Sequence, residues 1–212
     1  FMKYVIWDWN GTLFDDLDFC LESINLLLQR HGLKPLPDID AYKRVFRFPI
    51  REYYRDLGFQ FDKTPYEELA CEYMDIIHDP NVQDRCRLQK DALYTLDCLQ
   101  YLGVRQIILS VSEQRKLESQ VRRLGVYDYF YQILGISDIY GQSKAELARS
   151  LRAENLASPR EMLYIGDSLH DAEAAEILGC KCLLFAGGHQ YLPPDGTGYT
   201  VINRLCEVLD YV

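Results

Sequence analysis

Side chains that could bind a phosphate and a divalent metal ion occur at four separate places along the chain. In chain order they are Asp8, Ser110, Lys144, and the pair Asp167 and Asp171. The carboxylates could supply the hard oxygen ligands that Mg²⁺ prefers. Lys144 could neutralise phosphate charge, and Ser110 with backbone N–H groups near Asp8 could hold phosphate oxygens. A carboxylate can also act as a covalent nucleophile, so this set suits phosphoryl transfer, which requires mainly positioning and charge neutralisation.

The pattern of apolar residues predicts the elements that must position these side chains. Five short apolar runs are typical of buried strands: Lys3–Trp7, Val104–Leu109, Phe130–Leu134, Met162–Ile165 and Cys182–Phe185. Helical patterns separate most of these strands. Ser112 is expected to begin the helix after the second strand. Such alternation favours a mostly parallel sheet with right-handed crossovers. In a doubly wound sheet, ligands bind beyond the carboxyl ends of the strands, where Asp8, Ser110 and Asp167 fall.

Residues 15–87 do not follow this alternation. A helix is predicted from Asp15 or Asp16 to Gly32, another from Pro49 to Gly58, and a third from a capping box at Thr64 to about His78. No strand is predicted between them. The sequence therefore predicts a core formed by residues 1–14 and 88–212, with an all-helical insertion at residues 15–87.

Composition narrows the classes of protein to consider. The chain has 212 residues, of which 48% are hydrophobic and 26% charged, as in globular proteins. Its net charge of −9 argues against a nucleic-acid binder or a polybasic membrane-surface protein. No apolar run approaches the roughly 18 residues of a membrane-spanning helix, and the first is too short for a signal peptide. Seven cysteines without a paired pattern favour reduced thiols, so we expect a cytoplasmic protein; nothing indicates an oligomeric state.

In their order and spacing the motifs resemble those of the haloacid dehalogenase-like hydrolase superfamily. The segment Asp8-Trp9-Asn10-Gly11-Thr12-Leu13 resembles the first motif, DxDGT, and Ser110 the second. Lys144 resembles the third motif, and residues 166–171 resemble the fourth, GDxxxD. The segment 48–59 is similar to the helical cap of phosphoglycolate phosphatase-like members. The resemblance implies a Rossmann-like α/β core with an inserted helical cap, acting as a Mg²⁺-dependent phosphatase on a small phosphorylated metabolite.

The resemblance also implies a role for each matched residue. Asp8 would be the nucleophile, forming an aspartyl-phosphate. The metal ligands would be Asp8, the backbone carbonyl of Asn10, and Asp167, with Asp171 in support. The transferring phosphoryl group would be bound by Ser110, Lys144, Gly11 and Thr12.

Asn10 departs from the family pattern. The family's phosphatases usually carry an aspartate there, which protonates the leaving oxygen and then accepts a proton from water. An amide cannot transfer a proton in this way, and such assistance is typically worth roughly 10²–10⁴-fold in rate. Weak turnover, or a phosphate- or metabolite-binding role without catalysis, is therefore the alternative. His170 or His189 could also substitute as the acid. A phosphoacceptor signalling domain is a further rival, but it would not need a long helical insertion.

Other residues have two interpretations each. Arg44, Arg47 and Arg51 could reach an anionic substrate from the cap, or could form a solvated helix face. His189 is either a loop residue or part of the site lining. We expect Trp7 in the core, leave Trp9 undecided, and interpret Cys180 and Cys182 as small buried hydrophobes rather than metal ligands.

Overall fold

Contacts within the chain divide it into two compact units. The structure is a computed structural model of residues 1–212, and residues 78, 80–83, 138–142 and 194–197 are outside its description. The core unit consists of Phe1–Phe14, Leu88–Gly188 and Leu192–Val212, and the helical unit consists of Asp15–Arg87 and His189–Tyr191. The chain passes between the units within two short strands that pair with each other, β2 (Phe14–Asp15) and β3 (Arg87–Leu88).

A six-stranded sheet in the order β5-β4-β1-β6-β7-β8 forms the centre of the core unit. Every neighbouring pair is parallel. The strands are β1 (Tyr4–Trp7), β4 (Arg105–Glu113), β5 (Phe130–Ile136), β6 (Met162–Gly166), β7 (Lys181–Phe185) and β8 (Thr200–Ile202). The predicted Rossmann-like, doubly wound parallel sheet is confirmed, and β8 is a strand that the apolar pattern did not predict.

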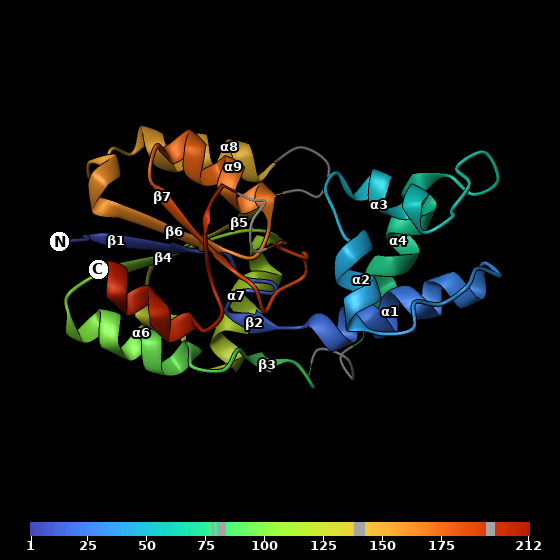
Figure 1. Ribbon diagram of the computed structural model, residues 1–212, viewed down its shortest axis with the longest axis horizontal. Helices are drawn as coiled ribbons and strands as arrows, with labels where there is room; N and C mark the ends of the chain where they lie inside the picture. Colours follow the sequence, from blue (N-terminus) through green and yellow to red (C-terminus); the bar gives the residue numbers. More distant parts are fainter. Residues whose placement is uncertain (78, 80–83, 138–142, 194–197) are drawn as a thin grey trace. The chain divides into compact units, whose positions relative to one another are not determined.

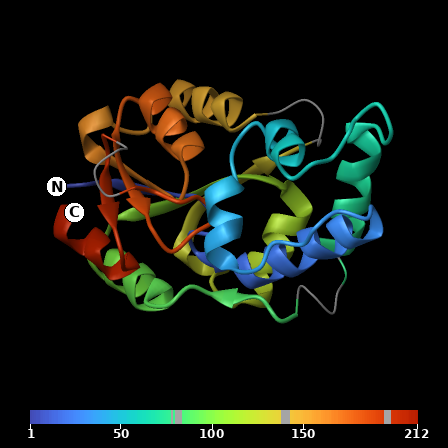
Figure 2. The ribbon, with the colours of Figure 1, turned by 45° about the vertical axis from the view of Figure 1, so that its right-hand side comes forward.

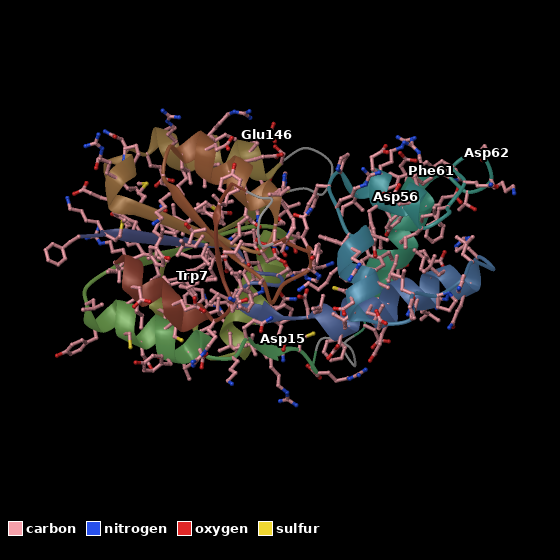
Figure 3. The ribbon with its side chains drawn as sticks, in the orientation of Figure 1. Trp7, Asp15, Asp56, Phe61, Asp62 and Glu146 are labelled. Atoms are coloured by element: carbon pink, nitrogen blue, oxygen red, sulfur yellow. The ribbon has the colours of Figure 1, made fainter. Side chains whose placement is uncertain are left out.

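Helices cover both faces of this sheet (Figure 1). They are α6 (Ala92–Tyr101), α7 (Gln114–Arg123), α8 (Lys144–Ala153) and α9 (Leu169–Leu178), with 3₁₀ turns η1 (Tyr127–Tyr129), η2 (Pro159–Glu161) and η3 (Leu205–Tyr211). Successive side chains of β1 point to opposite faces of the sheet. Tyr4 and Ile6 belong to the apolar cluster that includes residues of α8 and α9. Trp7, labelled in Figure 3, is fully buried and donates to Gln106 Oε1 at 3.0 Å, which confirms its predicted place in the core.

Strand β4 and helix α7 correct one expectation. Ser112 does not begin a helix, because β4 continues through Ser110 and Ser112 to Glu113. Glu113 is the N-cap of α7, and its carboxylate accepts the N–H groups of Arg115 and Lys116, each at 3.1 Å. A glutamate side chain therefore caps the helix that Ser112 was expected to begin.

The helical unit contains α1 (Leu17–Arg30), α2 (Ile39–Val45), α3 (Ile50–Asp56) and α4 (Tyr66–Ile77). Helices α1 and α4 lie side by side (Figure 2). Their apolar faces meet the aromatic rings of Tyr42, Tyr53 and Tyr54 in one buried cluster. The predicted end of the third helix at about His78 lies outside the described residues. Within the described ranges, none of the helices is both long and apolar enough to cross a membrane.

Residues 189–191 are placed differently from the expectation, which put all of 88–212 in the core. Contacts group them with the helical unit, where the N–H of Tyr191 donates to the carbonyl of Lys43 at 3.0 Å. The guanidinium of Arg44 also lies over the Tyr191 ring, 5.5 Å from its centroid.

Candidate active site

A tight loop after β1 holds Asp8. The N–H of Asp8 still donates to the carbonyl of Ile165 on β6 at 2.8 Å, which continues the sheet to this residue. The carbonyl of Trp9 then accepts three N–H groups, from residues 12, 13 and 14, at 2.9–3.2 Å. Gly11 has φ of +77°, a left-handed conformation that favours glycine. This turn brings the Thr12 hydroxyl back onto Asp8, where it donates to Oδ2 at 3.0 Å.

Trp9, left undecided above, anchors this loop. Its side chain is fully buried, and its Nε1–H donates to Gln120 Oε1 on α7 at 2.9 Å. Its ring stacks on Phe14 with centroids 5.5 Å apart. Trp9 therefore has a structural role in holding the loop that follows Asp8.

Lys144 joins two of the acidic residues. It is the first residue of α8, where Ser143 and Glu146 form a capping box that fixes the helix start. The side chain is buried, and its ammonium group donates to Asp8 Oδ1 and Asp171 Oδ1. The structure thus brings together residues that are 136 positions apart in the sequence.

Asp171 accepts hydrogen bonds on both of its carboxylate oxygens. Its Oδ2 accepts the N–H groups of Asp167 and Ser168 at 3.1 and 3.0 Å and the Ser168 hydroxyl at 2.7 Å. Its Oδ1 accepts the Tyr164 hydroxyl at 3.3 Å besides Lys144. Asp171 closes the capping box at the start of α9 and also orders the turn that carries Asp167.

The three aspartates Asp8, Asp167 and Asp171 form one buried cluster. Each offers a carboxylate oxygen, and these oxygens lie within 4.8 Å of one another. When all are ionised, three carboxylates against the one ammonium of Lys144 leave a formal charge of −2. Oxygen donors around this charge fit a hard divalent cation such as Mg²⁺.

Burial and mutual charge shift the pKa values inside this cluster. Desolvation first, and then the charge of Asp171, raise the pKa of Asp8 to about 8. Burial alone would also raise the pKa of Asp171, but Lys144 and the donors of Ser168 bring it below its ordinary value. Burial would lower the pKa of Lys144, yet the carboxylates of Asp171 and Asp8 hold it well above its usual range. An added cation would therefore favour the ionised form of Asp8.

Two glycines make room for the cluster. A Cβ on Gly166 would lie 2.2 Å from Asp171 Cγ, and a Cβ on Gly188 would lie 2.2 Å from Asp167 Cβ. Any side chain at either position must displace a cluster aspartate. Gly188 lies just after β7, and nothing in the sequence around it indicated a role in this cluster.

Ser110 and Ser112 form a polar group beside Asn10. The Ser112 hydroxyl donates to Asn10 Oδ1 at 2.8 Å, and the Ser112 N–H donates to Ser110 Oγ at 3.1 Å. Ser110 is buried, and its hydroxyl donates to Ser112 Oγ at 3.2 Å. The amide of Asn10 is thus oriented by Ser112, a residue for which the sequence suggested only a helix start.

The three arginines each contact a different partner. Arg44 lies over Tyr191, as described above. Arg47 pairs with Asp56 at 2.7 Å, and Arg51 lies over the Phe61 ring, 5.2 Å from its centroid.

The two histidines considered as substitute acids also have partners. The Nδ1 atom of His170 lies 3.2 Å from Glu173 Oε2, and the Glu173 side chain is exposed. His189 is buried in the helical unit, where its Nε2 lies 3.0 Å from Asp16 Oδ1.

The fold and this site define a class: doubly wound α/β proteins with an aspartate after the first strand and a lysine-bridged acidic cluster at the carboxyl ends of the strands. Comparison with known proteins makes the class specific. Residues 5–185 match the model of the family described as haloacid dehalogenase-like hydrolase. The chain belongs to this family.

Relatives with curated names are similar over most of the chain. A phosphoglycolate phosphatase of Yersinia pseudotuberculosis serotype I is 36% identical over 202 residues, which cover 90% of this chain and 83% of that protein. A phosphoglycolate phosphatase of Neisseria gonorrhoeae is 26% identical over 184 residues, covering 84% of this chain and 78% of that protein.

Solved structures agree on the fold. A haloacid dehalogenase-like hydrolase of Streptococcus pneumoniae has a TM-score of 0.82 at 17% identity, covering 99% of this chain and 98% of its own. Protein Tyrosine Kinase A of Mycobacterium tuberculosis also has a TM-score of 0.82, at 20% identity, covering 99% and 97%. At these identities the similarity shows the fold alone.

Proposed function

We propose that this protein is a Mg²⁺-dependent phosphatase that hydrolyses a small phosphorylated metabolite through an aspartyl-phosphate on Asp8. The family and the phosphoglycolate phosphatase relatives support the reaction class. The observation that carries the proposal is the buried cluster in which Lys144 joins Asp8 to Asp171. In this cluster Asp8 would be the nucleophile, Lys144 a cationic ligand of the phosphate, and the aspartates the metal ligands.

The metal would be held by Asp8, Asp167 and the backbone carbonyl of Asn10, with Asp171 in support. The donor set fits, because it consists of oxygens and carries excess negative charge. When bound, the ion would supply charge neutralisation for the carboxylates and for the oxygens of the transferring phosphoryl group.

Asp8 would carry the covalent chemistry. One of its carboxylate oxygens would attack phosphorus, the bond from phosphorus to the ester oxygen would break, and the leaving oxygen would take a proton from solvent. Water would then attack the phosphorus of the aspartyl-phosphate and lose a proton to solvent, the bond to Asp8 would break, and inorganic phosphate would leave. Thr12 and Lys144 donate to the two oxygens of Asp8, which orients the carboxylate for the attack.

The remaining predicted residues would bind substrate. Ser110 and Lys144 would hold the phosphoryl oxygens, as donors do at developing negative charge. Gly11 and Thr12 would join them only if their N–H groups exchanged their present acceptors, the carbonyls of Phe14 and Trp9, for phosphoryl oxygens. The helical unit would act as a cap that excludes bulk water. Arg44, Arg47 and Arg51 remain candidates for contacts to the anionic part of the metabolite.

The central test is hydrolysis with and without Mg²⁺. The substrates are 2-phosphoglycolate, other small phosphomonoesters and p-nitrophenyl phosphate, whose leaving group needs no protonation. We expect Mg²⁺-dependent release of phosphate that Asp8→Asn abolishes. Release that is equal in the Asp8→Asn variant would contradict the proposal.

Asn10 favours a second candidate, a metabolite-binding protein with little turnover. Its amide cannot transfer a proton, and Ser112 already holds its oxygen. This candidate predicts that calorimetry detects Mg²⁺-dependent binding of 2-phosphoglycolate while no substrate, p-nitrophenyl phosphate included, is turned over.

A further inference from the structure

A second convergent set of metal-ligating side chains lies in the helical unit. It consists of Asp16, Cys20 and His189, whose ligand atoms all lie within 4.8 Å of one another. All three residues are buried, with 5%, 7% and 6% of their surface exposed. The chemistry proposed for the acidic cluster of the core unit uses none of them.

The local structure directs the three side chains to one point. Asp16 is the N-cap of α1 and Cys20 lies four residues further on, so both project from the same face of the helix. The Cys20 thiol donates to Asp16 Oδ2 at 3.7 Å, and His189 Nε2 lies 3.0 Å from Asp16 Oδ1. A nitrogen, a sulfur and an oxygen donor therefore surround one small volume.

Neighbouring aromatic residues fix two of these ligands. The Tyr42 hydroxyl lies 2.9 Å from His189 Nδ1. When this hydroxyl accepts the Nδ1–H, the lone pair of Nε2 is directed toward Asp16 and Cys20. The rings of Tyr42 and Phe46 pack against the imidazole with centroids 5.8 and 5.3 Å away, and Tyr73 hydrogen-bonds to the Cys20 sulfur. Metal-binding histidines characteristically have such a partner on the second ring nitrogen.

The donor types discriminate between metals. An imidazole, a thiolate and a carboxylate suit Zn²⁺, a borderline-soft ion, whereas Mg²⁺ takes oxygen ligands. Asp16 and a Cys20 thiolate together would neutralise the two charges of the ion with a neutral His189, which limits the cost of burying it. Burial raises the pKa of the Cys20 thiol well above its ordinary value, so binding would displace a proton from sulfur.

We propose that Asp16, Cys20 and His189 form a Zn²⁺ site in the helical unit, with a fourth position left to water. Three protein ligands and one exchangeable position are an established arrangement for this ion. The alternative is a metal-free network in which a protonated His189 pairs with Asp16 beside a buried thiol. A metal probe whose absorption depends on a thiolate ligand should give a signal at the Zn²⁺ site and none at the metal-free network.

Co²⁺ provides that probe. The full chain, stripped with a chelator and then saturated with Mg²⁺ to occupy oxygen sites, is titrated with Co²⁺. We expect one equivalent to produce a thiolate-to-cobalt charge-transfer absorption that Zn²⁺ removes. Cys20→Ser should lose this absorption, while Cys182→Ser, a thiol with the same 7% exposure in the core unit, should keep it.

Variants around the cluster separate binding from folding. Tyr42→Phe removes only the hydroxyl beside His189 and should weaken Zn²⁺ binding about 10–100-fold. Circular dichroism establishes that each variant is folded, and Asp16→Asn replaces Cys20→Ser should the latter unfold. Absence of the charge-transfer absorption in the wild-type chain would overturn the proposal, as would its persistence in folded Cys20→Ser or Asp16→Asn.

Discussion

Asn10 departs from the first motif that the sequence resembles. On the proposed function its side chain would stand where a proton-transferring acid is needed, but an amide can only donate or accept hydrogen bonds. The Ser112 hydroxyl, which donates to Asn10 Oδ1 at 2.8 Å, would equally serve a carboxylate there. An aspartate at position 10 would therefore keep the hydrogen bond that now orients the amide.

Asn10→Asp should accordingly raise kcat for alkyl phosphates by roughly 10²–10⁴-fold, the usual worth of general acid–base assistance. The gain should be much smaller for p-nitrophenyl phosphate, whose leaving group departs without a proton. Steady-state kinetics on both substrates measure the difference. Equal gains on the two substrates would show that the new carboxylate acts otherwise than as an acid.

Asp8 should make the metal-free protein less stable as pH rises. Burial, followed by the charge of Asp171, raises its pKa from the ordinary value of 3.8 to about 8. Between these values the folded state keeps a proton that the unfolded chain has released, so stability falls as pH rises toward 8. Urea unfolding in a chelator at several pH values should show this slope in the wild type. Asp8→Asn should lack it.

Saturating Mg²⁺ provides the control for that slope. A bound cation favours the ionised carboxylate, so the contribution of Asp8 to the pH dependence should disappear. A slope that persists unchanged in Asp8→Asn would assign it to other groups.

Sequence reasoning could find the residues whose chemistry is evident from type and position. Asp8, Lys144 and Asp167 stand at the ends of apolar runs or at a helix start, and the parallel sheet brings such positions together. Ser112 and Gly188 could not be found in this way. Their importance depends on neighbours in the folded chain: Ser112 donates to Asn10, 102 positions away, and the Gly188 backbone lies against Asp167 of the preceding strand-to-helix turn.

At the scale of elements, the backbone of the loop after β7 packs closely against Asp167 at Gly188. Gly188→Ala would place a Cβ 2.2 Å from both Cβ and Oδ2 of Asp167. The aspartate must move, so Mg²⁺ affinity should fall about 10–100-fold, as for other disturbed metal surroundings. Isothermal titration calorimetry measures the change.

Gly103→Ala is the matched control for that substitution. Gly103 has φ of +74° and open space around its Cα, so alanine introduces backbone strain without a steric clash. It should destabilise the protein by about 1–2 kcal/mol and leave Mg²⁺ affinity unchanged. Unchanged Mg²⁺ affinity in Gly188→Ala would contradict the role assigned to the loop.

The elements themselves were predictable where burial is continuous. The runs at β1, β6 and β7 are almost entirely buried, and their apolar sequences predicted them. Strand β8 escaped prediction because it has only three residues, two of them half-buried. The start of α7 was misplaced because a glutamate rather than a serine caps the helix.

At the scale of the molecule, bound Mg²⁺ should raise the melting temperature of the protein. At 100 times its Kd, a ligand that binds only the folded state contributes about 2.7 kcal/mol, which for this chain length raises Tm by about 5–10 °C. We expect this shift with Mg²⁺ in the wild type and its loss in Asp167→Asn. Calorimetric scans with Mg²⁺ or with a chelator measure it. An equal shift in Asp167→Asn would place the stabilising ion elsewhere.

The division into units was only partly accessible from sequence. The change from alternating strands and helices to helices alone marked residues 15–87. The grouping of His189–Tyr191 with the helical unit depends on contacts such as Tyr42 with His189, which are 147 positions apart. No local pattern encodes a contact of that separation.

Trapping the covalent intermediate tests the central claim most directly. The protein is mixed with substrate and Mg²⁺, quenched in acid, and treated with borohydride, which reduces an aspartyl-phosphate to homoserine. Peptide mass spectrometry should then find homoserine in place of Asp8, only when substrate and Mg²⁺ are both present. Phosphate release with Asp8 unmodified, or with the modification at another aspartate, would contradict the account.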